Sequence, residues 1–237
     1  ESVKNERLKT DLITNVSHDI KTPLTSIINY VDLLKRENIQ DPKIQGYLDI
    51  LEAKAQRLKH LTEDVVEASK ISSGNITMEY MNINFVEMIN QTTGEFAEKF
   101  EKRNLQIVLN VPEKPVMVRT DGRRMWRVIE NIYNNAAKYA LEGTRVYADL
   151  IEKEHTVEFS LKNISEQPLN ISADELTERF IRGDVSRSTE GSGLGLSIAK
   201  NLTELQGGKF ELYLDGDLFK VTIVFPKAVV GQSMTKS

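Results

Sequence analysis

One short stretch of the chain combines three groups that can do chemistry together. The sequence Ser17-His18-Asp19-Ile20-Lys21-Thr22-Pro23 places an imidazole, an adjacent carboxylate and a hydroxyl close together if it is helical. A histidine ring nitrogen can attack phosphorus while a nearby carboxylate takes the proton from the other ring nitrogen. Thr22, four residues after His18, could position a water molecule. The stretch therefore predicts a site that moves a phosphoryl group on and off His18.

Each of these residues also has an ordinary interpretation, because a lone histidine is often a surface or core residue, and Asp19 and Thr22 suit any polar helix face. Apolar residues around the stretch recur at spacings of three, four and seven, which predicts a helix with one buried stripe: Ile13, Ile20, Leu24, Ile27, Val31 and Leu34. His18 lies off this stripe, so we expect its ring to face solvent. Pro23 lacks an amide hydrogen, so we expect the helix to bend or loosen just past His18.

A second polar set lies far along the chain, in the segment Glu130 to Tyr139 of a predicted helix. Asn131, Asn135, Lys138 and Tyr139 share one helix face because their spacing is i, i+4, i+7 and i+8. Amide oxygens suit Mg²⁺ held jointly with phosphates, Lys138 can offset phosphate charge, and Tyr139 can contact a base or ribose. The alternative for such a face is a solvated surface, with Tyr139 in the core.

A glycine-rich segment, Gly191-Ser192-Gly193-Leu194-Gly195-Leu196, follows a polar stretch and opens a predicted helix. Glycines let backbone N–H groups approach phosphate oxygens, and a helix N-terminus favours negative charge. No strand precedes the segment, as a dinucleotide-binding fold would require. We interpret it as a phosphate-binding lid hinged on glycine.

The first part of the chain predicts two long helices. One runs to about Glu37, and Asp41-Pro42 then supplies an N-cap and a proline at the first helical position of the second, which ends at 72–75. Such a hairpin leaves apolar surface uncovered, so we expect a second copy to pair with it in a four-helix bundle. The alternative is that the hairpin packs on the rest of its own chain.

From Ile76 the pattern changes to strands alternating with helices. Strands are expected at 77–83, 105–109, 116–118, 144–151, 156–162, 209–214 and 218–225. Helices are expected at 85–102, from an Asp121 cap to about 140, at 174–180 and at 195–206. The predicted fold class is thus α+β: a long helical hairpin, then an α/β sandwich with helices on one face of a sheet. We expect domains at 1–74 and 75–228, and a frayed tail at 229–237.

The amino-acid composition excludes several classes of function. The 237 residues carry a net charge of −4, which does not indicate nucleic-acid binding. The absence of cysteine excludes disulfides and thiolate chemistry. No apolar run approaches the roughly 18 residues that a membrane-spanning helix needs. The chain begins without methionine and enters directly into a helical pattern, so we interpret it as a fragment.

Together these motifs resemble sensor histidine kinases of two-component systems. Residues 17–24 look like the H box of that family, Glu130 to Tyr139 like its N box, Glu178-Arg179-Phe180 like its F box, and Gly191 to Gly195 like its G2 box. The resemblance covers about residues 8 to 227. It implies a dimerisation and phosphotransfer hairpin followed by an ATP-binding domain of the histidine kinase and gyrase type.

The resemblance also implies roles for individual residues. His18 would be the phosphoacceptor, Asp19 the base, and Thr22 the residue used to dephosphorylate a partner response regulator. Asn131 and Asn135 would hold Mg²⁺ with ATP. The remaining implied ATP-binding residues are Lys138, Tyr139, Asn163, the lid arginines Arg182 and Arg187, Gly191, Gly193, Leu194 and Gly195. Such kinases usually form the cytoplasmic portion of a membrane protein, behind a membrane-spanning sensor.

One motif departs from the family pattern. Where the G1 box Asp-x-Gly-x-Gly is expected, the chain reads Asn163-Ile164-Ser165-Glu166-Gln167. Asn163 then replaces the acid that reads adenine, although Ser165 or a water molecule could read the base instead. The expected function is a protein-histidine kinase core, and the alternative is a scaffold or phosphatase-dominant protein with a degraded nucleotide pocket. A free-standing ATPase of the gyrase type would not explain the His18 helix.

Overall fold

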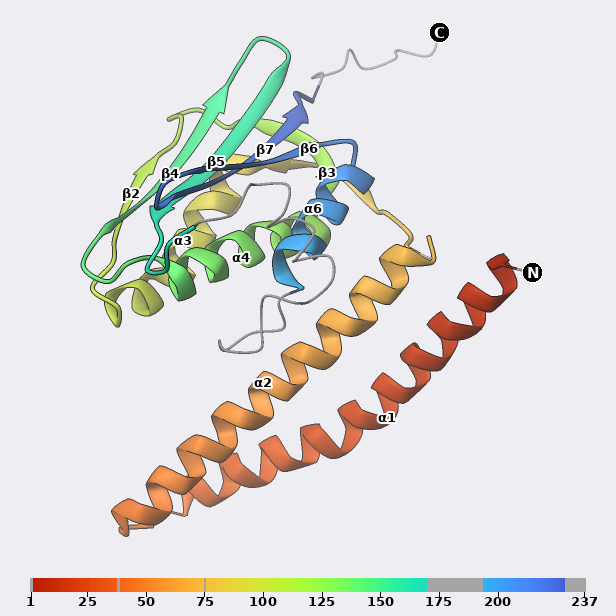
Figure 1. Ribbon diagram of the computed structural model, residues 1–237, viewed down its shortest axis with the longest axis vertical. Coiled ribbons are helices and arrows are strands. Elements are labelled where there is room, and N and C mark those ends of the chain that lie inside the picture. Colours follow the sequence, from red (N-terminus) through yellow and green to blue (C-terminus); the bar gives the residue numbers. More distant parts are fainter. Residues whose placement is uncertain (1, 38, 75, 170–193, 229–237) are drawn as a thin grey trace, which may run out of the picture. The chain divides into compact units, whose positions relative to one another are not determined.

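The computed structural model describes residues 2–37, 39–74, 76–169 and 194–228, without the side chains of residues 2–15 and His18. The chain divides into two compact units: of the described residues, those up to Ile76 and Leu194 belong to the first, and residues 77–169 and 195–228 belong to the second. The first unit contains two helices, α1 (Ser2–Arg36) and α2 (Pro42–Ser72), joined by a short turn (Figure 1). Among the described helices, none combines the length and the apolar character that a bilayer crossing requires.

The turn of the hairpin is fixed by local capping and by charge. The Asp41 side chain accepts a hydrogen bond from the Lys43 backbone N–H at 2.8 Å, which confirms the predicted N-cap. Lys35 near the end of α1 contacts Asp49 at 2.8 Å and Glu52 at 2.7 Å on α2, and these carboxylates raise its pKa. These contacts fix the register of the two helices next to the turn.

Helix α1 continues through Pro23 without a break. Figure 1 shows α1 as a curved, uninterrupted helix, and a proline inside a helix favours such bending. The hydroxyl groups of Thr25 and Ser26 donate to the carbonyls of Lys21 and Thr22 at 2.8 and 3.3 Å. The helix is therefore continuous through the turn after His18, where a bend or loosening is predicted.

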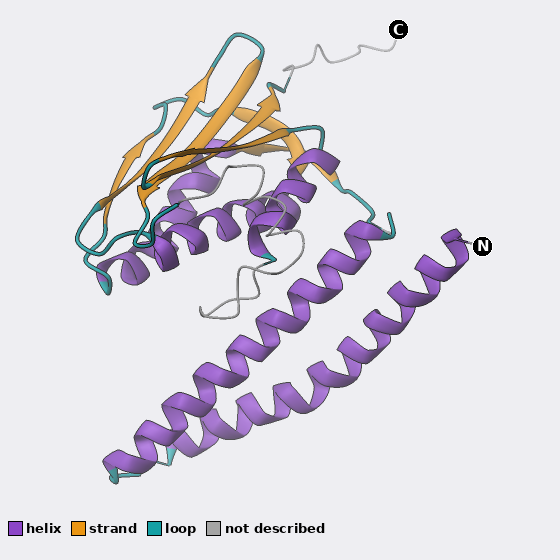
Figure 2. Ribbon diagram, viewed as in Figure 1, coloured by secondary structure: helices purple, strands orange, loops and turns teal. Residues whose placement is uncertain are grey.

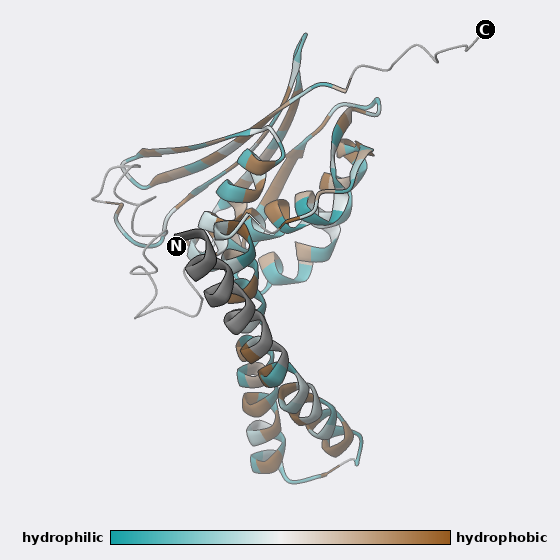
Figure 3. Ribbon diagram, turned by 90° about the vertical axis from the view of Figure 1, so that its right-hand side faces the viewer, coloured by the Kyte–Doolittle hydropathy of each residue, from teal (hydrophilic) through white to brown (hydrophobic). Residues whose placement is uncertain are grey.

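The predicted apolar stripe of α1 is only partly buried within one chain. Leu24 and Val31 are buried, whereas Ile20 and Ile27 are 39% and 49% exposed and Leu34 is exposed as well. A hairpin of two helices covers only one side of each helix, so the prediction that these three residues are buried is wrong for the single chain. The Ile13 side chain lies outside the description. Figure 3 shows apolar stretches recurring along the described part of both helices.

The second unit contains seven strands and three described helices. Their bounds are β1 (Tyr80–Asn84), α3 (Phe85–Glu101), β2 (Gln106–Asn110), β3 (Met117–Asp121), α4 (Gly122–Tyr139), β4 (Arg145–Glu152), β5 (Thr156–Ile164), α6 (Gly195–Leu205), β6 (Lys209–Asp215) and β7 (Leu218–Pro226). The predicted strand at 77–83 begins three residues late, because pairing with β3 starts only at Tyr80. The predicted helix at 174–180 lies outside the described residues.

Five strands form one mixed sheet in the order β2-β4-β5-β7-β6, and β1 pairs with β3 in a separate two-stranded sheet. Only β2 and β4 are parallel, and the β4–β5 hairpin turns where Lys153 N–H donates to the Thr156 carbonyl at 2.8 Å. Figure 2 shows α3, α4 and α6 on one face of this sheet, which confirms the predicted sandwich. On β7, buried residues alternate with less buried ones, as expected for a strand with one covered face.

An aromatic cluster closes the core between the helices and the sheet. Tyr133 of α4 stacks on Phe159 of β5 at 6.2 Å between ring centroids and also packs against Phe96 and Phe100 of α3. Its hydroxyl lies 2.8 Å from that of Thr93, and burial raises the pKa of Tyr133 to about 12. This cluster fixes one side of α4 against the sheet, which leaves the opposite side for the polar residues.

A buried polar network anchors the start of α4 to the end of α6. The Gln206 side-chain oxygen accepts from the Thr120 hydroxyl and from the Asp121 N–H at 3.1 Å. Asp121 in turn accepts from the backbone N–H groups of Glu79 at 2.9 Å and Arg124 at 3.1 Å, which confirms it as the cap of α4. Burial opposes ionisation of Asp121, but these N–H donors outweigh it and lower the pKa of the carboxyl.

The turn after α6 leaves no room for a side chain at Gly208. Gly207 has φ +80°, and a Cβ on the next residue, Gly208, would lie 2.6 Å from two ring carbons of the buried Phe225. We expect Gly208→Ala to lower the free energy of unfolding by about 1–3 kcal/mol through overpacking. The matched control is Gly94→Ala at an exposed position of α3, where no described atom lies within 4 Å of the added carbon. Chemical denaturation of both variants tests this, and equal stabilities would contradict it.

Candidate functional site

The turn that carries the candidate phosphoacceptor lies in the middle of α1. Asp19 and Thr22 are exposed, whereas Ser17 is buried. The predicted outward orientation of the His18 ring lies outside the described side chains. The helix nevertheless brings the backbone of His18 next to Asp19 and one turn from Thr22. The carboxylate and hydroxyl that could serve His18 therefore reach solvent, where a phosphoryl donor can approach.

The predicted polar face of α4 is present, and its residues differ in burial. Asn131 is 8% exposed, and its buried Nδ2 atom has no hydrogen-bond partner in the described part of the chain. Asn135 and Tyr139 are half-buried, and Lys138 is exposed. A buried amide nitrogen that lacks an acceptor costs free energy unless something else fills that position. Asn131 thus marks the inner end of a polar surface that becomes more open toward Lys138.

Helix α6 begins directly against this surface. A Cβ added to Gly195 would lie 3.2 Å from the Asn131 side-chain oxygen, so the absence of a side chain lets the start of α6 approach this amide closely. Leu194 precedes it and is half-buried. The other predicted residues of the loop and its arginines, namely Arg182, Arg187, Gly191 and Gly193, lie outside the described residues, as does the F box at 178–180.

Asn163 is a second buried amide that lacks a partner on one atom. It lies near the end of β5, is 4% exposed, and donates from Nδ2 to the Ile164 carbonyl at 3.1 Å. Its Oδ1 atom is buried and accepts no hydrogen bond from any residue that the structure describes. The side chain is therefore oriented as an acceptor, which suits a ligand that brings an amino donor. The neighbouring Ser165 is buried, and its hydroxyl accepts from the Gln167 N–H at 3.3 Å.

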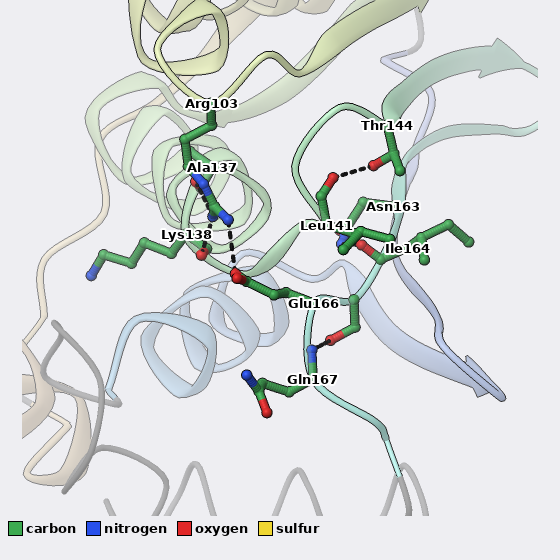
Figure 4. Close-up of polar contacts among 10 residues, drawn as sticks. Arg103, Ala137, Lys138, Leu141, Thr144, Asn163, Ile164, Glu166 and Gln167 are labelled. Carbon is green, nitrogen blue, oxygen red and sulfur yellow. Dashed lines mark hydrogen bonds and ion pairs between the residues drawn. The ribbon is translucent and has the colours of Figure 1, made fainter.

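Arg103, which no sequence motif singles out, joins the end of α4 to the segment after β5. Its guanidinium donates to the Ala137 carbonyl at 3.1 Å, to the Lys138 carbonyl, and to Glu166 at 2.8 Å (Figure 4). These partners are 34 to 63 residues away in the chain. No local pattern signals such a contact, apart from a basic residue placed just beyond a predicted helix end.

Two family models match the chain. The model described as His Kinase A (phospho-acceptor) domain matches residues 8–74. The model described as Histidine kinase-, DNA gyrase B-, and HSP90-like ATPase matches residues 120–229. The first range includes the His18 turn, and the second includes α4, Asn163 and α6.

Curated relatives carry sensor names. Sensor protein VanSC of Enterococcus gallinarum is 32% identical over 225 residues, which is 94% of this chain and 62% of that protein. Sensor histidine kinase WalK of Bacillus subtilis is 27% identical over 213 residues, which is 88% of this chain and 35% of that protein. The chain therefore spans less than two thirds of the length of these relatives.

Solved structures share the fold. ShkA, crystallised in complex with AMPPNP, gives a TM-score of 0.74 at 19% identity and covers 93% of this chain and 47% of its own. The nucleotide-free catalytic domain of ThkA gives 0.56 at 26% identity over 63% of this chain and 97% of its own. The two family models cover the hairpin and most of the second unit, and the two relatives match 94% and 88% of the whole chain. The chain therefore belongs to the sensor histidine kinases of two-component systems.

Proposed function

We propose that this chain is an ATP-dependent protein-histidine kinase core, which phosphorylates His18 and passes the phosphoryl group to an aspartate of a response regulator. The observation that carries the proposal is a pair of buried amide atoms, Asn131 Nδ2 and Asn163 Oδ1, which with Asn84 Oδ1 are the three buried side-chain atoms that have no hydrogen-bond partner among the described residues of this ATPase-like fold. Buried polar atoms without partners are rare, and a polar ligand that supplies partners for both explains them. The same chain carries the His18 turn on α1.

The residues present fit a nucleotide with its metal ion. Asn131 and Asn135 lie one turn apart on α4 and would hold Mg²⁺, which supplies charge neutralisation at the phosphates when it is bound. Lys138 offers a positive charge at the exposed end of the same face, and Tyr139 offers an aromatic ring for the base or ribose. Leu194 and Gly195 would bring backbone N–H groups of the start of α6 to the phosphates, together with Gly191, Gly193, Arg182 and Arg187.

At the hairpin, a ring nitrogen of His18 attacks the γ-phosphorus of ATP. The new N–P bond forms as the bond between the γ-phosphorus and the β–γ bridging oxygen breaks, and ADP leaves with that electron pair. Asp19 takes the proton from the other ring nitrogen, which keeps the phosphorylated imidazole neutral at the ring. The phosphoryl group then passes to a carboxylate oxygen of the regulator.

The hairpin requires a partner for its uncovered apolar surface. Large apolar side chains remain exposed on both helices, and we propose that a second copy of this chain covers them in a four-helix bundle. They include Ile20, Ile27, Tyr30, Leu33, Leu34, Ile44, Tyr47, Ile50, Leu51, Leu58 and Val65. The regulator partner is supported by ThkA, which was crystallised in complex with the response regulator protein TrrA at a TM-score of 0.62 to this chain.

The proposed domain bounds are 1–74 for dimerisation and phosphotransfer and 75–228 for ATP binding, with a tail at 229–237. The relatives named as sensors extend well beyond the matched region, which supports control of this core by a sensor segment elsewhere in the protein. By the same likeness, we propose that the core works on the cytoplasmic side of a membrane-bound sensor.

The test of the kinase proposal is incubation of the chain with γ-labelled ATP and Mg²⁺, followed by acid and base treatment of the labelled protein. A phosphohistidine is labile to acid and stable to base, so loss of label in acid only is the expected result. A protein that binds ATP but takes up no label would favour the second candidate, a phosphatase-dominant signalling protein. The observation behind that candidate is Asn163 at the position of an expected acid.

Thr22→Ala tests the expected phosphatase role. We expect normal phosphorylation of His18 and about ten- to a hundredfold slower removal of phosphate from the regulator, because the hydroxyl would orient the hydrolytic water but takes no part in the attack on ATP. Thr25→Ala is the matched control, because it removes the hydroxyl of a second exposed threonine of α1, which donates to the Lys21 carbonyl at 2.8 Å. Equal dephosphorylation rates for wild type and Thr22→Ala would remove this role.

Asn163→Asp tests how the base is read. The wild-type side chain must give up its bond to the Ile164 carbonyl to present a donor to guanine, so we expect it to favour ATP over GTP modestly. An aspartate makes a charge-assisted bond to the adenine amino group, about 1.5–3 kcal/mol instead of about 0.5–1.5, and should raise the preference for ATP.

The same substitution should lower the stability of the nucleotide-free protein, because a buried carboxylate would then face the Ile164 carbonyl that now accepts from Nδ2. Dissociation constants for ATP and GTP and thermal melts of both proteins measure these effects, with Asn110→Asp at the exposed end of β2 as the control. An unchanged ratio of the two dissociation constants would exclude Asn163 from the base-binding position.

A further inference from the structure

The end of α3 fixes where Arg103 lies. Asn104 adopts φ +51°, in the left-handed region that asparagine tolerates, and Leu105 N–H donates back to the Phe100 carbonyl at 2.8 Å. Leu105 is buried below this turn. The helix end therefore stops sharply and leaves Arg103 directed at the C-terminus of α4, with its side chain 25% exposed.

At that C-terminus, Arg103 satisfies groups that the helix itself leaves open. Carbonyls in the last turn of a helix have no intrahelical donor, and their partial negative charge attracts a cation. The Arg103 guanidinium donates to the carbonyls of Ala137 and Lys138, the two residues just before Tyr139. The planar guanidinium can donate to both carbonyls and to a carboxylate at the same time, which a lysine ammonium cannot do with the same geometry.

The third partner, Glu166, belongs to the segment that follows β5. Glu166 N–H donates to the Tyr139 carbonyl at 2.8 Å, and Leu141 N–H donates to the Ile164 carbonyl at 2.8 Å. The described part of this segment, residues 165–169, contains no glycine. The two backbone hydrogen bonds hold this segment in place, and the Arg103 side chain connects it to the end of α4 through Glu166 (Figure 4).

We propose that Arg103 is a positioning residue of the nucleotide site. It holds the last turn of α4, which carries Lys138 and Tyr139, in a fixed relation to the end of β5, which carries Asn163, and it does not itself touch the nucleotide. This inference rests on the proposed function, because those three residues are the proposed contacts to ATP. The Arg103–Glu166 pair is half-exposed on the Glu166 side, so the two carbonyl contacts carry most of the effect.

The alternative is that Arg103 is a helix cap that matters for stability alone. The two cases differ in what the variants do to ligand binding. If Arg103 positions the site, Arg103→Ala should weaken ATP binding about tenfold. Arg103→Lys should recover part of the loss, and Glu166→Gln, which keeps an acceptor, should weaken binding only about two- to threefold. If Arg103 is a cap alone, the melting temperature falls and the affinity of the folded protein stays the same.

The experiment is calorimetric titration of the full 237-residue chain with ATP and Mg²⁺, paired with thermal melts and with amide hydrogen exchange at Leu141 and Glu166. The matched control is Lys102→Ala, whose partner Glu98 lies at 2.7 Å on the exposed face of α3. We expect weaker binding and faster exchange at these two amides in Arg103→Ala, with wild-type behaviour in the control.

The outcomes distinguish a failure of the proposed kinase function from a failure of the Arg103 positioning role. If wild-type protein does not bind ATP, the proposed function is overturned. If wild type binds ATP and folded Arg103→Ala binds it equally well, only the positioning role is overturned. Should Arg103→Ala fail to fold, Arg103→Lys and Glu166→Gln decide, and wild-type affinity in both overturns the positioning role.

Discussion

His18→Gln abolishes incorporation of acid-labile phosphate, the largest effect expected for any single change in this chain. Glutamine fills a similar volume on the same helix turn but has no ring nitrogen that can form a bond to phosphorus. The proposed nucleotide site lies in the second unit, so the dissociation constant for ATP should stay within about twofold of the wild-type value. Labelled-ATP incubation and calorimetric titration of the same preparation measure the two quantities.

The matched control for this variant is His60→Gln on α2. His60 is the other histidine of the hairpin, and its ring lies 4.0 Å from Glu63 on an exposed helix face. It should incorporate phosphate as the wild type does. Acid-labile label on His18→Gln, or its loss from His60→Gln, would move the phosphoacceptor away from His18.

Asn131→Ala should lower the rate of His18 phosphorylation about 10²–10³-fold. The change removes an amide proposed to serve the metal ion and phosphates, at a position where preorganised polar groups have their greatest effect on rate. The protein itself should fold normally, because the buried amide nitrogen has no partner among the described residues and alanine removes that group. Initial rates at several Mg²⁺ concentrations measure the loss.

Asn134→Ala is the control on the same helix. Its side-chain oxygen accepts from Lys99 at 3.2 Å on a different face of α4, so its removal should leave the rate near that of the wild type. If both variants phosphorylate His18 at the wild-type rate, the assignment of Asn131 to the nucleotide site is wrong.

Local features of the fold were predictable from the sequence. The caps at Asp41 and Asp121, the strand at 218–225 and the helix that follows Asp121 all depend on neighbours within a few positions, and all are confirmed. Periodicity also identified the polar face of α4, because residues four and seven apart share a helix face whatever surrounds them.

Other features depend on partners that the sequence pattern does not identify. The spacing of Ile20, Ile27 and Leu34 indicates a shared face, but it cannot distinguish a partner within the chain from a second copy, and these residues are exposed in the single chain. Likewise, nothing near Arg103 in sequence indicates that it bonds carbonyls 34 residues later. The orientation of the Asn163 amide also depends on one hydrogen bond, to Ile164.

The uncovered apolar face of the hairpin has a thermodynamic consequence. If a second copy supplies the missing cover, the hairpin gains stability by mass action, whereas the second unit closes its aromatic core within one chain. The two units should then respond differently to dilution: the helices loosen as the protein concentration falls, and the sheet unit keeps its melting temperature. The concentration of this protein would then help to determine the fraction of chains whose phosphoacceptor helix is folded and paired.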